Sequence, residues 1–130
     1  MFENLKVFQM AHAMASHASQ RQNVTARNIA NADTPGYKAR DVAPFTDVYR
    51  APDQFTAQKA TRAGHMTDDR SPGKTRITLA ADQSNMSPSG NSVSLEAEML
   101  KSVDNQRQHD RAIMIYKSSL DVLRSAIGRR

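Results

Sequence analysis

Apolar residues recur at helical spacing near both ends of the chain and are sparse between them. From about Phe2 to Asn31, steps of about 100° per residue gather one apolar face. This face contains Leu5, Phe8, Ala11, Ala15, Ala18, Ala26 and Ile29. A second strip, made by Val7, Met10 and Met14, lies about 100° or more from its centre. One face suffices for packing within the chain, so the second strip needs another partner or is exposed.

This first helix is predicted to end at the stretch Asp33-Thr34-Pro35-Gly36. Proline disfavours the helical conformation for the residue before it, and Gly36 supplies the positive φ that a type II turn requires. Asn28 and Asn31 lie in the last helical turn, so we expect their side chains to hydrogen-bond backbone groups that are freed at the helix end. They form either an ordinary C-terminal cap or a pre-shaped elbow that fixes where the middle segment leaves the helix.

A second long helix is predicted to begin after Ser94, a residue type typical of N-caps, with Glu96 and Glu98 in the first turn. It should run to about Ile127, where Gly128 ends it. One face carries large apolar residues, namely Leu95, Met99, Ile113, Tyr116, Leu120, Leu123 and Ile127.

Two further features of this helix bear on how it packs. Ile115 and Val122 lie nearly opposite the main apolar face, and Gln106 and Asp110 interrupt the expected core face with polar groups. Two long amphipathic helices with secondary apolar strips indicate packing between subunits of an assembly. The helix faces expected to serve that assembly are Leu5, Phe8, Ala15, Met99, Ile113, Tyr116, Leu120, Leu123 and Ile127.

The middle of the chain, residues 38–92, has a different composition. Only 6 of its 55 residues are Leu, Ile, Val or Phe, and Pro and Gly divide it into turns. Its one strand-like run is Thr75–Leu79, whereas Arg50–Gly73 is predicted to be a flexible loop in which a helix over Thr56–Arg62 is conceivable.

The expected fold is therefore mainly α, with two long terminal helices packed as an antiparallel, coiled-coil-like pair. A loop-rich middle segment contains a short β-hairpin. We divide the chain into an N-terminal helix and turn (1–37), a middle segment (38–92) and a C-terminal helix (93–130) that forms one structural unit with the first part.

Composition narrows the class of protein. Leu, Ile, Val and Phe make up 22 of 130 residues, or 17%, and the mean hydropathy is −0.66. This falls below the roughly 20% at which a chain struggles to offset its ordering entropy by burial. A compact single-core enzyme is disfavoured, and an assembly in which neighbours cover apolar strips is favoured.

The net charge of +5 does not identify a nucleic-acid-binding protein. It is spread as +1 over residues 1–37, +2 over 38–92 and +2 over 93–130, with acids interleaved throughout. A nucleic-acid binder usually concentrates its charge on one face or arm. We expect no nucleic-acid partner, and a basic binding module ranks third among the alternatives.

No residues are arranged for catalysis, metal binding or a cofactor. The chain has no cysteine, and His12 and His17 are five residues apart, which is wrong for two ligands on one helical face. His109 and Asp110 are helical neighbours whose side chains diverge by about 100°. No apolar run approaches the roughly 18 residues that span a bilayer, and the first residues do not have the pattern of a cleavable signal peptide.

One stretch near the first turn resembles the signature of bacterial flagellar rod and hook proteins, in which it closes the N-terminal helix of each axial subunit. It reads Asn28-Ile29-Ala30-Asn31-Ala32-Asp33-Thr34-Pro35-Gly36-Tyr37-Lys38. Gly90–Met99 and Leu123–Arg129 also resemble this family, so the matches cover both ends of the chain. Two places depart from the commoner pattern: Thr25 stands where leucine is frequent, and Asn105-Gln106-Arg107 is more polar than usual.

The resemblance implies a structural subunit of the flagellar rod, and specifically of the proximal rod, because residues 38–92 are too few for the globular domain of distal rod and hook proteins. It implies a location in the basal body, in the part of the rod that spans the periplasm, and export through the flagellar type III apparatus without a cleaved signal peptide. The implied partners are copies of the chain, other rod proteins and the adaptor protein at the ring. The resemblance implies neither a cofactor nor membrane insertion.

Other functions stay open on the sequence alone. Another short proximal-rod protein of the same family fits as well, and a small cytosolic helical adaptor or export chaperone fits the composition.

Overall fold

The computed structural model describes residues 2–49, 77–79 and 87–128. In chain order the elements are α1 (Phe2–Ala30), β1 (Arg40–Val42), α2 (Phe45–Val48), β2 (Ile77–Leu79) and α3 (Leu95–Ile127). The loop predicted over Arg50–Gly73 and the helix considered over Thr56–Arg62 lie outside the described residues.

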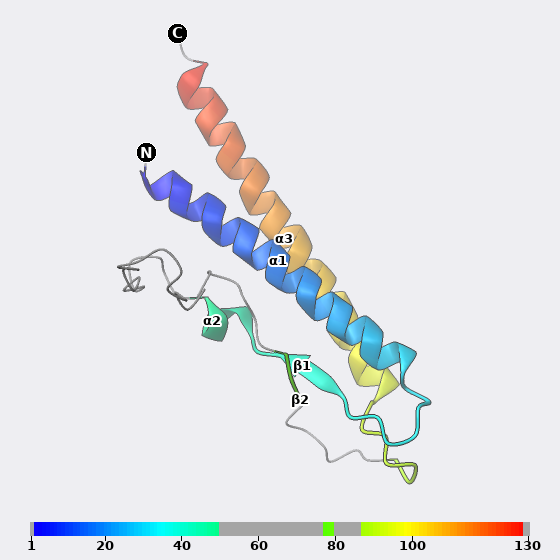
Figure 1. The fold of residues 1–130 in the computed structure, drawn as a ribbon. Coiled ribbons are helices and arrows are strands. Elements are labelled where there is room, and N and C mark those ends of the chain that lie inside the picture. The colour runs from blue at the N-terminus through cyan, green and yellow to red at the C-terminus, as the bar shows by residue number, and fades with distance from the viewer. Residues whose placement is uncertain (1, 50–76, 80–86, 129–130) are drawn as a thin grey trace, which may run out of the picture.

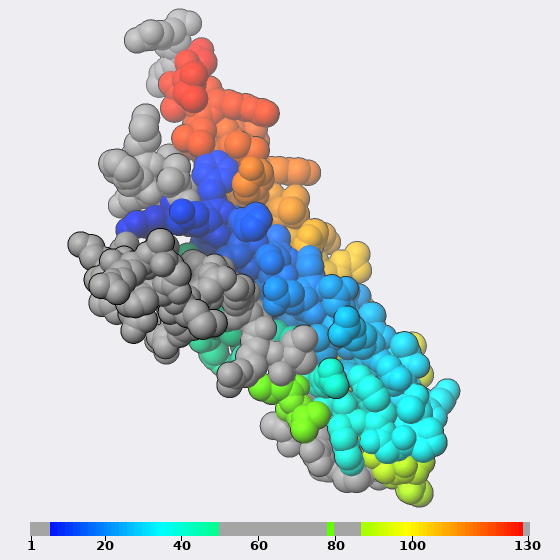
Figure 2. Space-filling view, in the orientation of Figure 1, coloured from blue at the N-terminus to red at the C-terminus, as the bar shows by residue number. Residues whose placement is uncertain are grey.

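The two long helices lie side by side and antiparallel, so the chain ends lie at the same end of the molecule (Figure 1). This confirms the predicted fold class. The start of α3 is the predicted one, because the Ser94 side chain accepts a hydrogen bond from Ala97 N at 3.4 Å. At its other end, α3 stops at Ile127 and projects beyond α1, as its red end shows in Figure 2.

Small and polar side chains, rather than large apolar ones, fill the contact between the helices. The largest side chains that are fully buried are His17, Asn28 and Asn105. The buried apolar residues are Ala11, Ala13, Ala18, Val24, Ala39, Val42 and Ala112. On α3 the buried positions Glu98, Asn105 and Ala112 are seven residues apart, which is the repeat of a coiled-coil seam.

The predicted contact face of α3 is therefore wrong in part. Met99 is 55% exposed and Ile127 is 78% exposed, and Leu95, Ile113 and Tyr116 are also exposed. At 100° per residue, Met99 and Ile113 lie about 100° around the helix from the adjacent seam residues Glu98 and Ala112, and the other three lie about 40–60° from the nearest seam residue. The buried seam consists of alanine and polar side chains. Alanine is small enough for the two helices to approach closely. Glu98 can be buried because it accepts hydrogen bonds from α1 and from its own helix.

Other predicted core positions also differ from the structure. Gln106 and Asp110, expected on the core face of α3, are exposed, and so is Ala26 of α1. Ala11 and Ala18 are buried as predicted, and Phe8 is half-buried with its ring 5.1 Å from that of Tyr116 in an edge-to-face contact. The outer apolar residues of α3 thus remain available, within the described residues, for contacts beyond this chain.

The middle segment contributes a two-stranded antiparallel sheet, which confirms the expected β-hairpin. The register pairs Arg40 with Leu79, Asp41 with Thr78 and Val42 with Ile77. The short helix α2, a single turn directly after Pro44, was not among the elements expected from the sequence, although proline favours the start of a helix or turn. The strand β1 lies along α1 and links the sheet to the helix pair.

Candidate functional site

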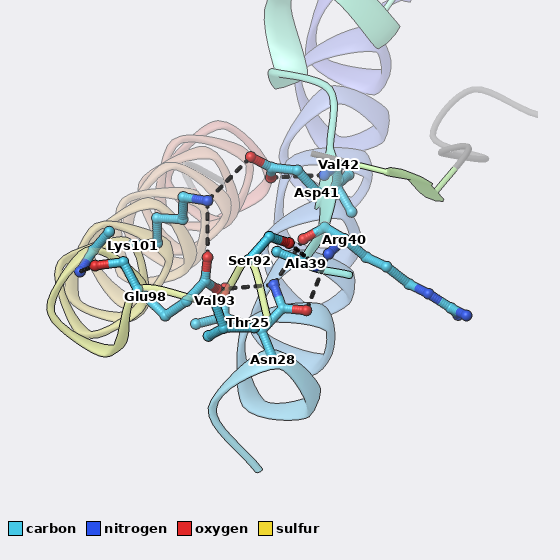
Figure 3. Close-up of polar contacts among 12 residues, drawn as sticks. Thr25, Asn28, Ala39, Arg40, Asp41, Val42, Ser92, Val93, Glu98 and Lys101 are labelled. Carbon is cyan, nitrogen blue, oxygen red and sulfur yellow. Dashed lines mark hydrogen bonds and ion pairs between the residues drawn. The ribbon is translucent and has the colours of Figure 1, made fainter. Parts of the chain in front are cut away.

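Asn28 joins three segments of the chain at the end of the helix pair opposite the termini. Its side-chain Nδ2 donates to Arg40 O at 2.7 Å and to Glu98 Oε2 at 3.0 Å. Its Oδ1 accepts from Tyr37 Oη at 3.2 Å and from Arg40 N at 3.1 Å. Both donors and both acceptor positions of this fully buried amide are therefore used, which fixes its orientation. Figure 3 shows the Asn28 amide between Glu98 and Arg40. We call the surrounding cluster, made by Asn28, residues 31–42 and 87–92, Glu98 and Lys101, the elbow.

Asn28 also takes the place of a neighbouring strand along one edge of β1. One amide side chain bonds both the N–H and the C=O of Arg40, as a paired residue of an adjacent strand would. The Ser92 hydroxyl similarly accepts from Ala39 N at 2.8 Å. The edge of β1 that faces the helices is thus satisfied by side chains, while the Arg40 side chain points away from the cluster (Figure 3).

A buried carboxylate completes the connection to α3. Glu98 is 3% exposed, and its Oε1 accepts from Lys101 Nζ at 2.9 Å. Lys101 Nζ also contacts Asp41 Oδ2 at 3.2 Å, so one ammonium bridges α3 and β1. Burial alone would lower the pKa of Lys101, but its hydrogen bond with Glu98 and the charge of Asp41 outweigh burial and raise that pKa. Lys101 therefore stays charged and neutralises the buried carboxylate.

Asn91 organises the turn that follows α1. Its Nδ2 lies 2.9 Å from Asn31 O, 2.7 Å from Ala32 O and 2.9 Å from Thr34 O, while its Oδ1 accepts from Val93 N at 2.7 Å. These carbonyls belong to the region where the helix ends and lack helical partners. Asn91 thus ties the turn after α1 to the segment that leads into α3.

Two glycines with positive φ make these turns possible. Gly36 has φ of 71°, and Tyr37 N bonds Thr34 O at 3.3 Å, the arrangement expected of a turn with proline second and glycine third. Gly90 has φ of 77°, and Gly36 N donates to Ser89 O at 3.0 Å. A Cβ on Gly90 would lie 3.6 Å from Gly36 Cα, so the two turns are in direct contact.

Replacing Gly36 with valine is expected to lower the free energy of unfolding by about 1–2 kcal/mol or more, because a β-branched residue resists positive φ. A Cβ added to Gly36 would have no atom within 4 Å, so the expected cost is backbone strain and not a clash of the added Cβ. Gly36→Asn is the matched control, since asparagine tolerates this conformation better. Urea unfolding of the three proteins followed by circular dichroism measures the difference, and equal stability of the valine variant and the wild type would contradict this turn assignment.

His17 fastens the middle segment to α1. It is fully buried, its Nε2 donates to Ala43 O at 2.9 Å, and its ring packs edge-on against Phe45 with centroids 5.5 Å apart. Its Nδ1 is buried without a hydrogen-bond partner among the described residues. Burial lowers the pKa of His17 from its ordinary value of 6.5, against the raising effect of the bond to Ala43, and the Arg21 charge lowers it further.

This geometry predicts a loss of stability in acid. Because the folded-state pKa of His17 is lowered, its contribution is fully present above pH 6.5 and is lost as the pH falls through the lowered value. His17→Gln, whose amide can still donate to Ala43 O, should show a flatter decline in unfolding free energy between about pH 7 and pH 5. The exposed His12→Gln is the control on the same helix. Parallel pH profiles for wild type and His17→Gln would refute this role.

The motif residues predicted from the sequence differ in their hydrogen-bond partners and in their exposure. Asn31 caps the helix as expected, with Nδ2 bonded to Arg27 O at 2.8 Å, whereas Asn28 binds the middle segment and α3 instead of the helix end. Ile29 and Tyr37 are half-buried, and the exposed members of the motif are Ala30, Thr34, Pro35 and Gly36.

The predicted assembly residues are distributed along both helices. Leu5 lies in α1. The half-buried members are Phe8, Ala15, Leu120 and Leu123, and the exposed members are Met99, Ile113, Tyr116 and Ile127. Sequence reasoning missed the elbow roles of Asn91, Ser92 and Lys101, because their partners lie more than 50 positions away and no local pattern reveals such contacts.

The hydrogen bonds of the elbow hold segments of the polypeptide together. In the described parts of the chain no group of three or more His, Asp or Glu residues is placed to hold a metal ion. Nor does any helix among residues 2–49 and 87–128 combine the length and apolar character needed to cross a membrane.

Comparison with known proteins points to one family. The profile of the family described as "Flagella basal body rod protein" matches residues 13–38, which include Asn28 and the turn after α1. The flagellar basal body rod protein FlgB of Agrobacterium fabrum is 35% identical over 116 residues, covering 88% of this chain and 87% of that protein. The proteins of the same name from Escherichia coli and Salmonella typhimurium are each 30% identical, covering 82% and 78% of this chain and 85% and 78% of their own lengths.

Proposed function

The chain belongs to the FlgB family of flagellar basal body rod proteins and is a structural subunit of the proximal rod, and we propose how it is built into that rod. The antiparallel pair α1 and α3 is the structural unit that packs against neighbouring subunits. The elbow sets the direction in which the middle segment leaves this unit. Residues 1–37 and 93–130 then act as one part and residues 38–92 as another.

The exposed apolar residues of α3 support this proposal. Leu100 is 67% exposed and Met114 is 65% exposed, in addition to the predicted assembly residues Met99, Ile113 and Tyr116. Exposed apolar residues on several faces of one helix are costly to leave in water, and their number favours burial against neighbouring subunits. A contact that joins different faces of successive subunits without closing a ring would produce a helical shaft.

Family membership also suggests the partners and the route. As a rod protein the chain assembles with other basal-body components, and we propose that these are its own copies, other rod proteins and the adaptor at the ring. We propose export by the flagellar type III apparatus. The role is structural rather than enzymatic, and it involves neither nucleic acid nor insertion into a membrane.

The observation that carries this function is the match to FlgB of Agrobacterium fabrum along 87% of that protein. Mass spectrometry of purified hook–basal-body particles, compared with cytosol of the same cells, tests it. We expect this chain in the particles and enriched over the cytosolic fraction. Finding it in flagellated cells only in the cytosol would reject the rod function and favour an export chaperone.

A further inference from the structure

Residues 43–49, which contain α2, are attached to α1 by contacts around one histidine. They continue from β1 beside α1 (Figure 1). Among the described residues, the hydrogen bond that joins this segment to α1 runs from His17 Nε2 to Ala43 O at 2.9 Å. The His17 ring also packs edge-on against Phe45, and the Phe45 ring stacks on that of Tyr49 with centroids 5.0 Å apart. We call these contacts of His17 with Ala43 and Phe45 the latch.

The neighbouring strand β1 is held by different chemistry. Asn28 and Ser92 bond the backbone of residues 39 and 40, and Lys101 contacts the Asp41 carboxylate. None of the elbow residues is a histidine. Residues 43–49 are each half-buried or exposed, so little of this segment is enclosed by the rest of the chain. The segment can therefore leave α1 without breaking a bond of the elbow, with the pivot directly after β1.

The hydrogen bond to Ala43 fixes the protonation state of His17 in the closed latch. A carbonyl oxygen only accepts, so Nε2 carries the proton and Nδ1 of the neutral ring carries a lone pair. The side chain is fully buried, and Nδ1 has no partner among the described residues. A second proton, taken up at Nδ1, would create a buried N–H without an acceptor on a ring that is now positively charged. Both features are costly in a buried position.

The surrounding charges do not compensate for a positive ring. Among the charged or titratable residues of the elements around His17 are Arg21 of α1, Arg40 and Asp41 of β1, Asp47 and Tyr49 of the attached segment, and His109 and Asp110 of α3. Asp41 contacts Lys101 Nζ, and Asp47 accepts from Thr46 Oγ1. His109 Nδ1 lies 3.8 Å from Asp110 Oδ1. Within the described residues no carboxylate bonds the His17 ring, and the charge of Arg21 disfavours a second cation.

We propose that protonation of His17 opens the latch and frees residues 43–49 from α1 while the elbow and the helix pair stay intact. The inference concerns the single chain and does not depend on the proposed function. Burial lowers the pKa of His17 against the raising effect of the bond to Ala43, and Arg21 lowers it further. The latch is therefore closed above pH 6.5 and opens as the pH falls through the lowered pKa. The middle segment then leaves the helix pair from the elbow alone.

A pair of spin labels measures this release in the full-length chain. The sequence has no cysteine, so Ala26→Cys with Thr46→Cys gives two labelling sites, both at exposed positions. Double electron–electron resonance reports the distance between them at about pH 7 and about pH 5, the range in which histidine titrates. We expect a narrow distribution at the higher pH and a broader, shifted one at the lower pH, with unchanged helical circular dichroism. An unchanged distribution, or loss of the helices at the same pH, overturns the proposal.

Two variants of the labelled chain assign the response to His17. His17→Gln keeps a donor for Ala43 O but takes up no proton in this range, so its distribution should not change with pH. His17→Ala removes the donor, and we expect the broad distribution at both pH values. A response of His17→Gln equal to that of the wild type would assign the release to another group. A closed segment in His17→Ala would show that the latch does not hold it. Either result overturns the proposal.

Two controls test whether the release is confined to residues 43–49. His109→Gln removes the histidine beside Asp110 and should respond to pH as the wild type does. The label pair Ala26→Cys with Arg40→Cys joins α1 to β1, and the Arg40 side chain points away from the elbow (Figure 3). We expect the distance of this second pair to stay constant. A shift of both pairs at the same pH would show that the elbow opens as well, and would overturn the proposal of a separate latch.

Discussion

Replacing Asn28 with aspartate is expected to lower the free energy of unfolding by about 3 kcal/mol or more. The carboxylate would lose both donors, which leaves Arg40 O unpaired and places a second negative charge at about the present 3.0 Å distance from Glu98. The site is fully buried, so water cannot screen this repulsion. Urea unfolding of the purified chain, followed by circular dichroism, measures the loss.

Two comparisons separate this effect from the general cost of a helical aspartate. Ala26→Asp places the same charge at an exposed position of the same helix and should cost less than about 1 kcal/mol. The double variant Asn28→Asp with Glu98→Gln removes the repulsion and should recover part of the loss. If Asn28→Asp and Ala26→Asp were equally mild, the elbow would not contribute to stability in the way described.

The second large effect concerns assembly rather than folding. Replacing both Ile113 and Leu120 with aspartate is expected to abolish rod formation, because two charges on the apolar strip of α3 could not be buried against a neighbouring subunit. Export should continue, since these residues contribute little to the core of the single chain. Motility in soft agar and the amount of the chain in purified basal bodies report on rod formation, and the amount of the chain outside the cytosol reports on export.

A matched control is available on the same helix. Ser118 and Ser125 are exposed and have the same seven-residue spacing as Ile113 and Leu120. The double aspartate variant at these serines changes charge and helix propensity alike without altering the apolar strip, and it should remain motile. Normal swimming by cells with both Ile113→Asp and Leu120→Asp would show that this strip is not an assembly face.

The helical parts of the fold could be predicted because their signals are local. Helical periodicity, the Ser94 cap and the turn around Gly36 each depend on residues within a few positions of one another, and all three agree with the structure. Which face of α3 packs against α1 could not be predicted in the same way. Periodicity assigns large apolar residues such as Met99 and Ile113 to the contact face, but this chain leaves them exposed and packs smaller or polar residues between its own helices.

The family, the two helices and the turn that ends the first of them follow from short-range patterns that can be read in the sequence. Three features depend on contacts that only the folded chain makes: Asn28 is saturated by four hydrogen bonds, Glu98 is buried beside it, and the buried Asn105 donates to Thr25. The contacts of Asn28 with Arg40 and of Asn105 with Thr25 join residues 12 and 80 positions apart. Whether a polar side chain is satisfied depends on which distant groups the fold brings to it, and no local pattern contains that information.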